Sequence, residues 1–356
     1  MPDNFSMSQV SRIALRKTSI PTLLQDVENV LELAEILPLL RSGQLILIKP
    51  NLVTDIQDYI DRGANTSLDI LDALLQILSD FHAKVEIVES ETGTSAKGRR
   101  LAYAWQRMGL EPLAVHYQAR LVNLSEAPRV TVPFTGKGLS GLDLPQRLFD
   151  ADLILNIPKI KTHKYAVLTC SMKNLFGLVP EPRRIIYHRW LHQTLCDLAL
   201  LLQPRMVTLV DGLTGMEGNG PLYGTPVEMN LLVAGKNCVA VDRTVCEIIG
   251  VSPHQVPYLR LAEKEPSLSV GNIELAGDPI EHCLRPFKPV EFNLYRLFEK
   301  KLMETPLVHV ITSGWFQRHV SSHLAGLTHR LRGGGYSWYL EESPNGTPSR
   351  QEENKI

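Results

Sequence analysis

One segment in the middle of the chain concentrates side chains that could bind an anion or transfer a proton. It follows a strand-like apolar run at residues 151–155 and continues to residue 177. Lysine ammonium groups bind carboxylates and phosphates as point charges, and histidine exchanges protons near neutral pH. The side chains that matter here are Lys159, Lys161, His163, Lys173 and Asn174. Their spacing predicts a pocket for an anion.

Five strand-like apolar runs share one feature, which is that each ends in polar side chains. These endings are Lys49 with Asn51, Glu89 with Glu91, Lys159 with Lys161 and His163, Asp211, and Lys236. In an open parallel sheet the C-terminal strand ends lie on one edge, where ligands bind. A single polar strand end is ordinary because loops are exposed. The recurrence across five runs favours one shared cleft over that ordinary explanation.

Side-chain chemistry suggests a role for each residue. Neighbouring lysines would keep His163 neutral at pH 7, so we predict that it is a general acid or base. Glu89 or Asp211 is the predicted catalytic partner. Two glycines of the loop-like segment 211–221 would let a ligand approach the backbone. The predicted substrate-binding residues are Lys49, Asn51, Lys159, Lys161, Lys173, Asn174, Gly218 and Gly220.

Three other patterns are less informative. His188 and His192 have the i, i+4 spacing of a helix face, and we interpret them as a surface pair rather than metal ligands. Residues 136–141 match G-x-G-x-x-G but lack the following helix of a dinucleotide site. The five cysteines form no C-x-x-C pair, so their spacing argues against an iron–sulfur cluster. A bound metal is left open, and no cofactor is assigned.

Composition narrows the class of protein. The chain has 356 residues, 44% of them hydrophobic and 21% charged, which is ordinary for a globular protein. A net charge of −1 argues against a nucleic-acid partner. No apolar run reaches the length of a membrane span, and residues 1–5 lack the layout of a secretory signal. We therefore expect a cytoplasmic protein.

Strand-like and helix-like segments alternate along most of the chain. Strands are predicted at residues 12–15, 45–48, 85–88, 130–132, 153–155, 207–210 and 231–234. Helices are predicted at residues 21–40, 68–82, 99–108, 188–202 and 239–249. This alternation predicts an α/β fold, with a mostly parallel sheet and helices on both faces. We expect an N-terminal α/β lobe at 1–150 and a second at 151–285.

Residues 286–356 do not continue the alternation of strands and helices. Residues 286–340 are predicted to be an amphipathic helical extension, and residues 341–356 a disordered tail. Many basic side chains accompany the apolar ones in residues 290–332. The extension could pack on the main domain, or it could dock a protein partner or a membrane surface.

The ordered motifs at residues 49–51, 156–163, 173–177, 211–212, 217–221 and 240–242 resemble the family catalogued as domain of unknown function 362. The resemblance covers about residues 12–280. Many members carry a ferredoxin-like tail with two four-cysteine motifs, which this chain lacks. The layout is also distantly similar to lactate-racemase-like proteins, which use a nickel-pincer cofactor. Their histidine-rich motif does not align here, so nickel is only a hypothesis.

Two functions of different class remain open. The first is an enzyme that acts on a small anionic substrate, a carboxylate or a phosphate, by redox or isomerase chemistry. The second is a non-catalytic protein that binds an anion or metal and docks a partner through residues 290–332. The sequence assigns neither the substrate nor the reaction.

Overall fold

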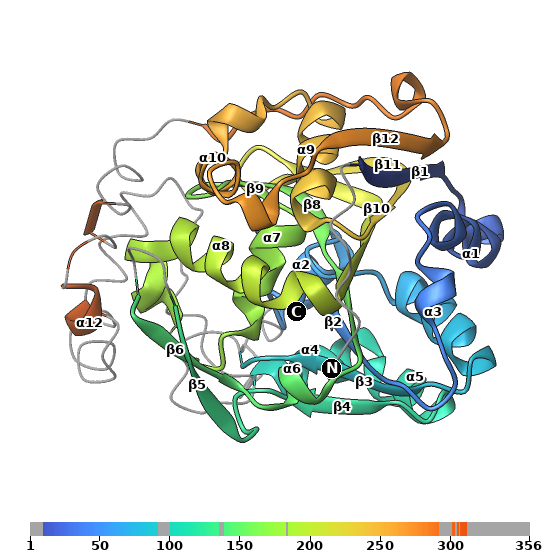
Figure 1. The fold of residues 1–356 in the computed structure, drawn as a ribbon, viewed down its shortest axis with the longest axis horizontal. Helices are drawn as coiled ribbons and strands as arrows, with labels where there is room; N and C mark the ends of the chain where they lie inside the picture. The colour runs from blue at the N-terminus through green and yellow to red at the C-terminus, as the bar shows by residue number, and fades with distance from the viewer. Residues whose placement is uncertain are drawn as a thin grey trace, which may run out of the picture.

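One large sheet organises the chain (Figure 1). The computed structural model describes residues 10–91, 100–134, 139–182, 184–291, 301–302, 305 and 307–311. The main strand order is β12-β1-β11-β10-β7-β2-β3-β4, and β8 and β9 extend from β10. The strands are β1 (Val10–Lys17), β2 (Leu45–Pro50), β3 (Lys84–Glu89), β4 (Arg120–Asn123), β7 (Leu153–Ile157), β8 (Lys159–His163), β9 (Val167–Thr169), β10 (Met206–Glu217), β11 (Thr225–Gly235) and β12 (Asn272–Gly277). A separate pair consists of β5 (Arg129–Pro133) and β6 (Gly141–Pro145).

Most pairings in the large sheet are parallel, as predicted. Parallel pairs join β4 to β3, β3 to β2, β2 to β7, β7 to β10 and β10 to β8. Antiparallel pairs join β1 to β11, β10 to β11 and β8 to β9. The central strands are continuous apolar runs because both faces of the sheet are covered.

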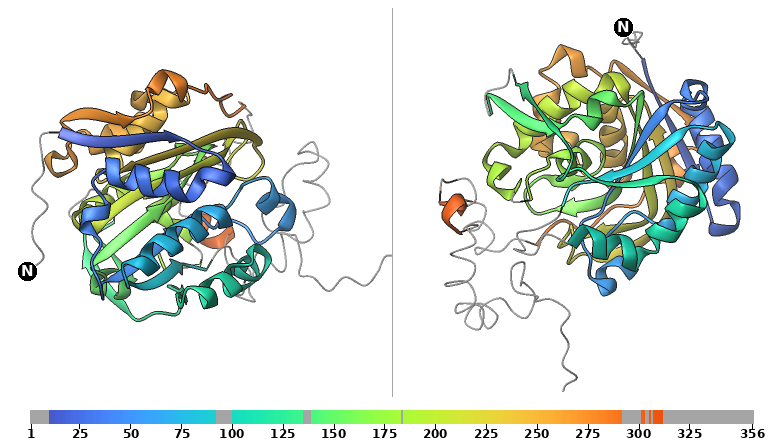
Figure 2. Two further views of the ribbon diagram at one scale, coloured as in Figure 1. Left: turned by 90° about the vertical axis from the view of Figure 1, so that its right-hand side faces the viewer. Right: turned by 90° about the horizontal axis from the view of Figure 1, so that it is seen from below.

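Helices cover both faces, which confirms the predicted fold class. Side chains alternate along β2, so Ile46 and Ile48 pack on one face and Leu47 on the other. The first face carries α1 and α3 side by side (Figure 2). The opposite face carries α7, α8, α9 and α10. Helix bounds are α1 (Leu23–Leu33), α2 (Gln57–Asp61), α3 (Leu68–Asp80), α4 (Arg100–Met108), α5 (Leu110–His116), α6 (Arg147–Asp150), α7 (Ser171–Asn174), α8 (Leu191–Leu202), α9 (Cys238–Ile248), α10 (Pro257–Ala262) and α12 (Val308–Ile311).

Both halves of the chain contribute to the same sheet. Strand β7 lies between β2 and β10, and β1 lies between β11 and β12. Each of the two hydrophobic cores also contains residues from before and after residue 150. The boundary expected near residue 150 therefore does not separate two sheets.

Two segments beyond the predicted strands also form strands. Residues 159–163 form β8, in which every residue is buried. Residues 211–217, predicted to belong to a glycine-rich loop, continue β10 beside β11. Glycine permits this close pairing, because a Cβ on Gly212 would lie 2.5 Å from the carbonyl oxygen of Leu231. The pairing register shifts just after this residue, between Gly212 and Thr214.

The predicted helix at residues 188–202 begins later than expected. Helix α8 starts at Leu191, and His188 lies in the preceding 3-10 turn η4 (Arg184–Trp190). His188 and His192 therefore do not share a single α-helix, and the prediction of a helical surface pair is wrong.

Only small parts of the predicted C-terminal extension fall within the described residues. Helix α12 packs near η4, and Val308 is buried there. The predicted tail at residues 341–356 lies outside the described residues. Within the described ranges, no helix has both the length and the apolar character that crossing a membrane requires.

We predict that Gly212→Ala lowers the free energy of unfolding by about 1–3 kcal/mol, since the new methyl group overpacks the β10–β11 ladder. Urea denaturation measures this change. Thr225→Ala, at the exposed start of β11, is the control and should change stability by less than about 0.5 kcal/mol. An equally small effect of Gly212→Ala would mean that this segment is a loop.

Candidate functional site

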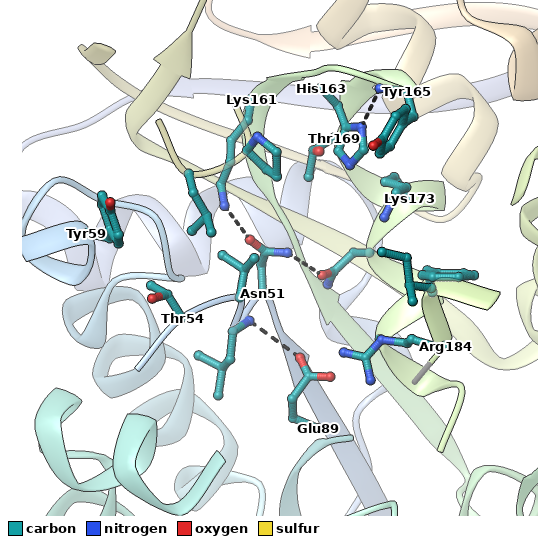
Figure 3. Close-up of a pocket in the computed structure, with 18 of the residues that line it drawn as sticks. Asn51, Thr54, Tyr59, Glu89, Lys161, His163, Tyr165, Thr169, Lys173 and Arg184 are labelled. Atoms are coloured by element: carbon teal, nitrogen blue, oxygen red, sulfur yellow. Dashed lines mark hydrogen bonds between the residues drawn. The ribbon is translucent and has the colours of Figure 1, made fainter. Parts of the chain in front are cut away.

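A cavity of about 240 Å³ opens where β2 and β3 end and β8 passes beside them (Figure 3). Its described lining contains six lysines and arginines but a single carboxylate, that of Glu89. The six are Lys49, Arg100, Lys161, Lys164, Lys173 and Arg184. Two imidazoles, those of His163 and His188, also face it. The cavity therefore has a strong excess of positive charge.

The Lys49 amino group forms a fully buried ion pair at the base of the cavity. Its Nζ donates to Glu89 Oε2 at 2.7 Å and to the Pro50 carbonyl at 2.6 Å. Burial lowers the pKa of Lys49, and Glu89 partly opposes that shift. A Cβ on Gly177 would lie 2.7 Å from both Lys49 Nζ and Glu89 Oε1. Glycine at position 177 thus leaves room for the pair.

Lys161 is also fully buried, but its hydrogen-bond acceptors are neutral. Its Nζ donates to Asn51 Oδ1 at 2.7 Å and to the carbonyl oxygen of Ala64. Burial lowers the pKa of Lys161 well below its usual value, and the nearby Lys159 lowers it further. In its protonated form the amino group has three donor hydrogens, so one donor remains for a ligand, and a bound anion would favour that form.

The position of His163 follows from strand geometry. Side chains two residues apart on a strand share a face, which places His163 beside Lys161 along β8 (Figure 3). Its Nδ1 accepts hydrogen bonds from the backbone N–H groups of Tyr165 and Ala166, both at 3.1 Å. Burial, reinforced by Lys173, lowers its pKa well below the usual value. The imidazole is therefore neutral, and because Nδ1 is an acceptor its proton lies on Nε2.

Lys173 and η4 form another wall. The Nζ of Lys173 lies 4.9 Å from the centre of the Phe176 ring. Burial lowers its pKa to about 7, and the cationic Arg184 and Lys49 contribute. Arg184 donates to the Glu91 carbonyl at 2.8 Å. An amine with this pKa can act as a base at neutral pH.

The imidazole of His188 packs against two aromatic rings of the cavity wall. Its ring meets Tyr165 and Phe176 edge to face, with centroids 5.6 Å and 5.3 Å apart. Burial lowers its pKa to about 3, with Lys173 the next cause. His188 is thus a neutral, packed imidazole at physiological pH.

A chain of side-chain amides connects the cavity to the core. Asn51 donates to Asn174 Oδ1 at 3.0 Å, and Asn174 donates to Asn156 Oδ1 at 2.8 Å. Asn156 donates in turn to the carbonyl and hydroxyl oxygens of Ser171. The buried carboxylate of Asp242 accepts from the Ser171 backbone N–H at 2.6 Å. This chain fixes the Asn51 oxygen that faces Lys161.

Lys159 and Asp211 form a second buried ion pair, which does not line the cavity. The Lys159 Nζ lies 3.0 Å from Asp211 Oδ1. Asp211 Oδ2 accepts from the backbone N–H of Ser67, the N-cap of α3, at 2.7 Å. The pair therefore joins β8 and β10 to the start of a helix.

The structure brings most of the predicted site residues together. Those that line the cavity are Lys49, Asn51, Glu89, Lys161, His163, Lys173 and Asn174. Lys159, Asp211, Gly218 and Gly220 do not. Gly220 instead packs against β8, since a Cβ there would lie 2.1 Å from the Thr162 carbonyl oxygen. Lys159 and Lys161 are both buried within β8.

Sequence reasoning missed part of the lining. Arg184, Tyr59 and Tyr223 come from segments with no strand-end pattern. The sequence also did not predict that His188 lines the cavity.

Metal ligation has little support in this cavity. Within the described part of the chain, no three side chains of His, Cys, Asp and Glu gather as a metal site. The described lining of the cavity therefore does not supply a ligand set for nickel.

Fold and site together define an α/β protein with a basic, partly buried pocket. The family profile described as Domain of unknown function (DUF362) matches residues 46–247, more than half of the chain. The chain belongs to this family. It is also 26% identical over 266 residues to a thylakoid-associated protein of Synechocystis sp. (strain PCC 6803), covering 72% of this chain and 79% of that protein.

Two solved structures share parts of the fold. A structural-genomics protein from Thermotoga maritima is 11% identical with a TM-score of 0.38, over 64% of this chain and 58% of its own. The lactate racemase apoprotein from Thermoanaerobacterium thermosaccharolyticum is 12% identical with a TM-score of 0.40. The match covers 67% of this chain and 56% of the racemase chain. The chain thus spans less than two thirds of either protein. Similarity at this level says nothing of a shared activity.

We predict that Glu89→Gln lowers the free energy of unfolding by about 3 kcal/mol or more, because it leaves Lys49 buried without a counter-charge. Chemical denaturation at neutral pH gives the measurement. Glu274→Gln is the control, since it removes an exposed partner of Arg12. A double variant, Lys49→Met with Glu89→Met, should recover most of the loss. If Glu89→Gln is as mild as the control, the pair does not stabilise the fold.

Proposed function

We propose that this protein is an enzyme that binds a small carboxylate or phosphate in the cavity and catalyses a proton transfer on it. The observation that carries the proposal is the excess of buried positive charge around Lys161. Burying an ammonium group without a counter-charge is unfavourable. An anionic substrate would supply the missing negative charge.

The proposed roles follow from the hydrogen bonds. Lys161 and Arg184 would hold the anionic group, and Asn51 would orient Lys161. His163 would donate a hydrogen bond through Nε2, since its Nδ1 accepts from the backbone. Of the general acid and general base roles predicted from the sequence, that geometry favours a neutral hydrogen-bond donor over a base. The buried Lys159–Asp211 pair would position β8 rather than touch the substrate.

Lys173 is the proposed base. A neutral amine near the bound anion would accept a proton from a C–H or O–H group of the substrate and return it later. Positioned hydrogen-bond donors such as His163 would stabilise charge that develops on the substrate oxygen. Of the redox and isomerase reactions considered from sequence, such a base favours isomerase-type chemistry.

We predict that sulfate binds more weakly as pH rises above 7. The pKa of Lys173 is lowered to about 7, so its ammonium form is lost as pH rises through that value. Sulfate keeps its charge over this range, and its affinity should fall by up to about tenfold per pH unit. Isothermal titration calorimetry between about pH 6 and pH 9 measures the slope.

Lys173→Arg provides the matched comparison for that titration. Arginine keeps its charge, so sulfate should still bind and the slope should flatten. Lys173→Gln should weaken sulfate at low pH toward the affinity seen at high pH. If both variants keep the wild-type dependence of sulfate affinity on pH, Lys173 is not part of the anion site.

Catalysis itself is tested by proton exchange. Purified protein is incubated in deuterated water with small carboxylates and phosphates, and deuterium incorporation is followed by mass spectrometry. The proposal expects exchange with at least one substrate class, lost in Lys173→Gln. Binding without any exchange or turnover would favour the alternative, a non-catalytic anion-binding protein.

The place of the protein in the cell is also a proposal. We infer a cytoplasmic location, and the name of the thylakoid-associated relative favours contact with a membrane surface. Co-sedimentation of the full chain with anionic and neutral vesicles tests this contact.

A further inference from the structure

We infer that the substrate carries a flat apolar group, the size of one aromatic ring, next to its anionic group. This inference rests on the proposed function, because it concerns the same cavity. It names a class of substrate: aryl or similarly planar carboxylates and phosphates, rather than small hydrophilic anions.

The cavity has two chemically different ends. Lys173, Arg184 and Glu89 lie at one side of Asn51, and Tyr59 lies at the other (Figure 3). Around Tyr59 the lining is mostly apolar and aromatic, with Thr54 as a polar neighbour. The apolar and aromatic residues include Val53, Tyr59, Leu222 and Tyr223, which pack together as a small cluster outside the two main cores. Such a division suits a ligand with one charged and one apolar end.

The apolar end is held by contacts between distant segments. Tyr59 comes from α2 and Tyr223 from the turn between β10 and β11. Their rings meet edge to face, with centroids 5.4 Å apart and an angle of 82°. Arg62, which directly follows α2, also donates to the Gly224 carbonyl at 3.1 Å. The aromatic wall is therefore built before a ligand arrives.

Lys161 connects the two ends. Its Nζ donates to the carbonyl oxygen of Ala64, and Ala64 belongs to the same apolar cluster. An anionic group on Lys161 would thus place the rest of the ligand beside Tyr59 and Tyr223. Apolar groups gain free energy on leaving water for such a surface, and aromatic rings also gain from edge-to-face contact.

The volume of the cavity is enough for an apolar group of one ring. A cavity of about 150 Å³ is enough to hold benzene. The 240 Å³ measured here therefore leaves space for one ring and one anionic group.

Two sulfonates with the same charged group test the inference. Methanesulfonate and benzenesulfonate are titrated into the full-length protein by calorimetry. Benzenesulfonate should bind at least about tenfold more tightly, which corresponds to about 1.4 kcal/mol. Tyr59→Ala and Tyr223→Ala should each remove most of this preference and leave methanesulfonate affinity within about twofold. Tyr103→Ala, on the exposed side of α4, is the control and should keep the full preference.

The outcomes separate this inference from the proposed function. Equal affinity for the two sulfonates would overturn the apolar subsite and leave anion binding intact. A preference that survives both tyrosine substitutions would also overturn it. If neither sulfonate, nor sulfate, binds the wild-type protein, the proposed function fails. The comparison of ligands on the wild-type protein stands even if one variant does not fold.

Discussion

The burial of lysine amino groups is the constraint on which the site depends. Lys49, Lys159 and Lys161 are all but completely buried, although lysine is among the residues least often found inside proteins. Two of them are neutralised by carboxylates, Glu89 and Asp211. Lys161 faces a cavity whose other cations, such as Lys173, add to its charge. A fold that keeps this imbalance is suited to receive a negative charge from outside.

The surrounding structure holds these charges in fixed positions. The amide chain from Asn51 through Asn174 and Asn156 satisfies polar groups that would otherwise be buried without partners. It ends at Asp242, which receives backbone N–H groups at the start of α7, the helix that carries Lys173. One hydrogen-bonded chain thus runs from Lys161 through the buried amides to the helix that carries Lys173. Preorganised groups of this kind are what electrostatic catalysis requires.

Much of the fold and of the charged lining could be predicted from the sequence, because strand-end residues in a parallel sheet share an edge. That rule placed Lys49, Glu89 and Lys161 in one cavity. It failed for Lys159 and Asp211, since local sequence does not show that residues 159–163 and 211–217 are themselves strands that pair with each other. The apolar wall was also missed, because Tyr59 and Tyr223 meet only through tertiary contact.

Direct observation of a bound anion is the measurement that tests the central claim most sharply. Crystals of the protein are soaked in selenate, and the selenium is located by its anomalous scattering. The account predicts a peak in the cavity, within hydrogen-bonding distance, about 3–4 Å from selenium to nitrogen, of Lys161 Nζ or Lys173 Nζ. Selenium peaks confined to exposed lysines and arginines, with none in the cavity, would contradict it.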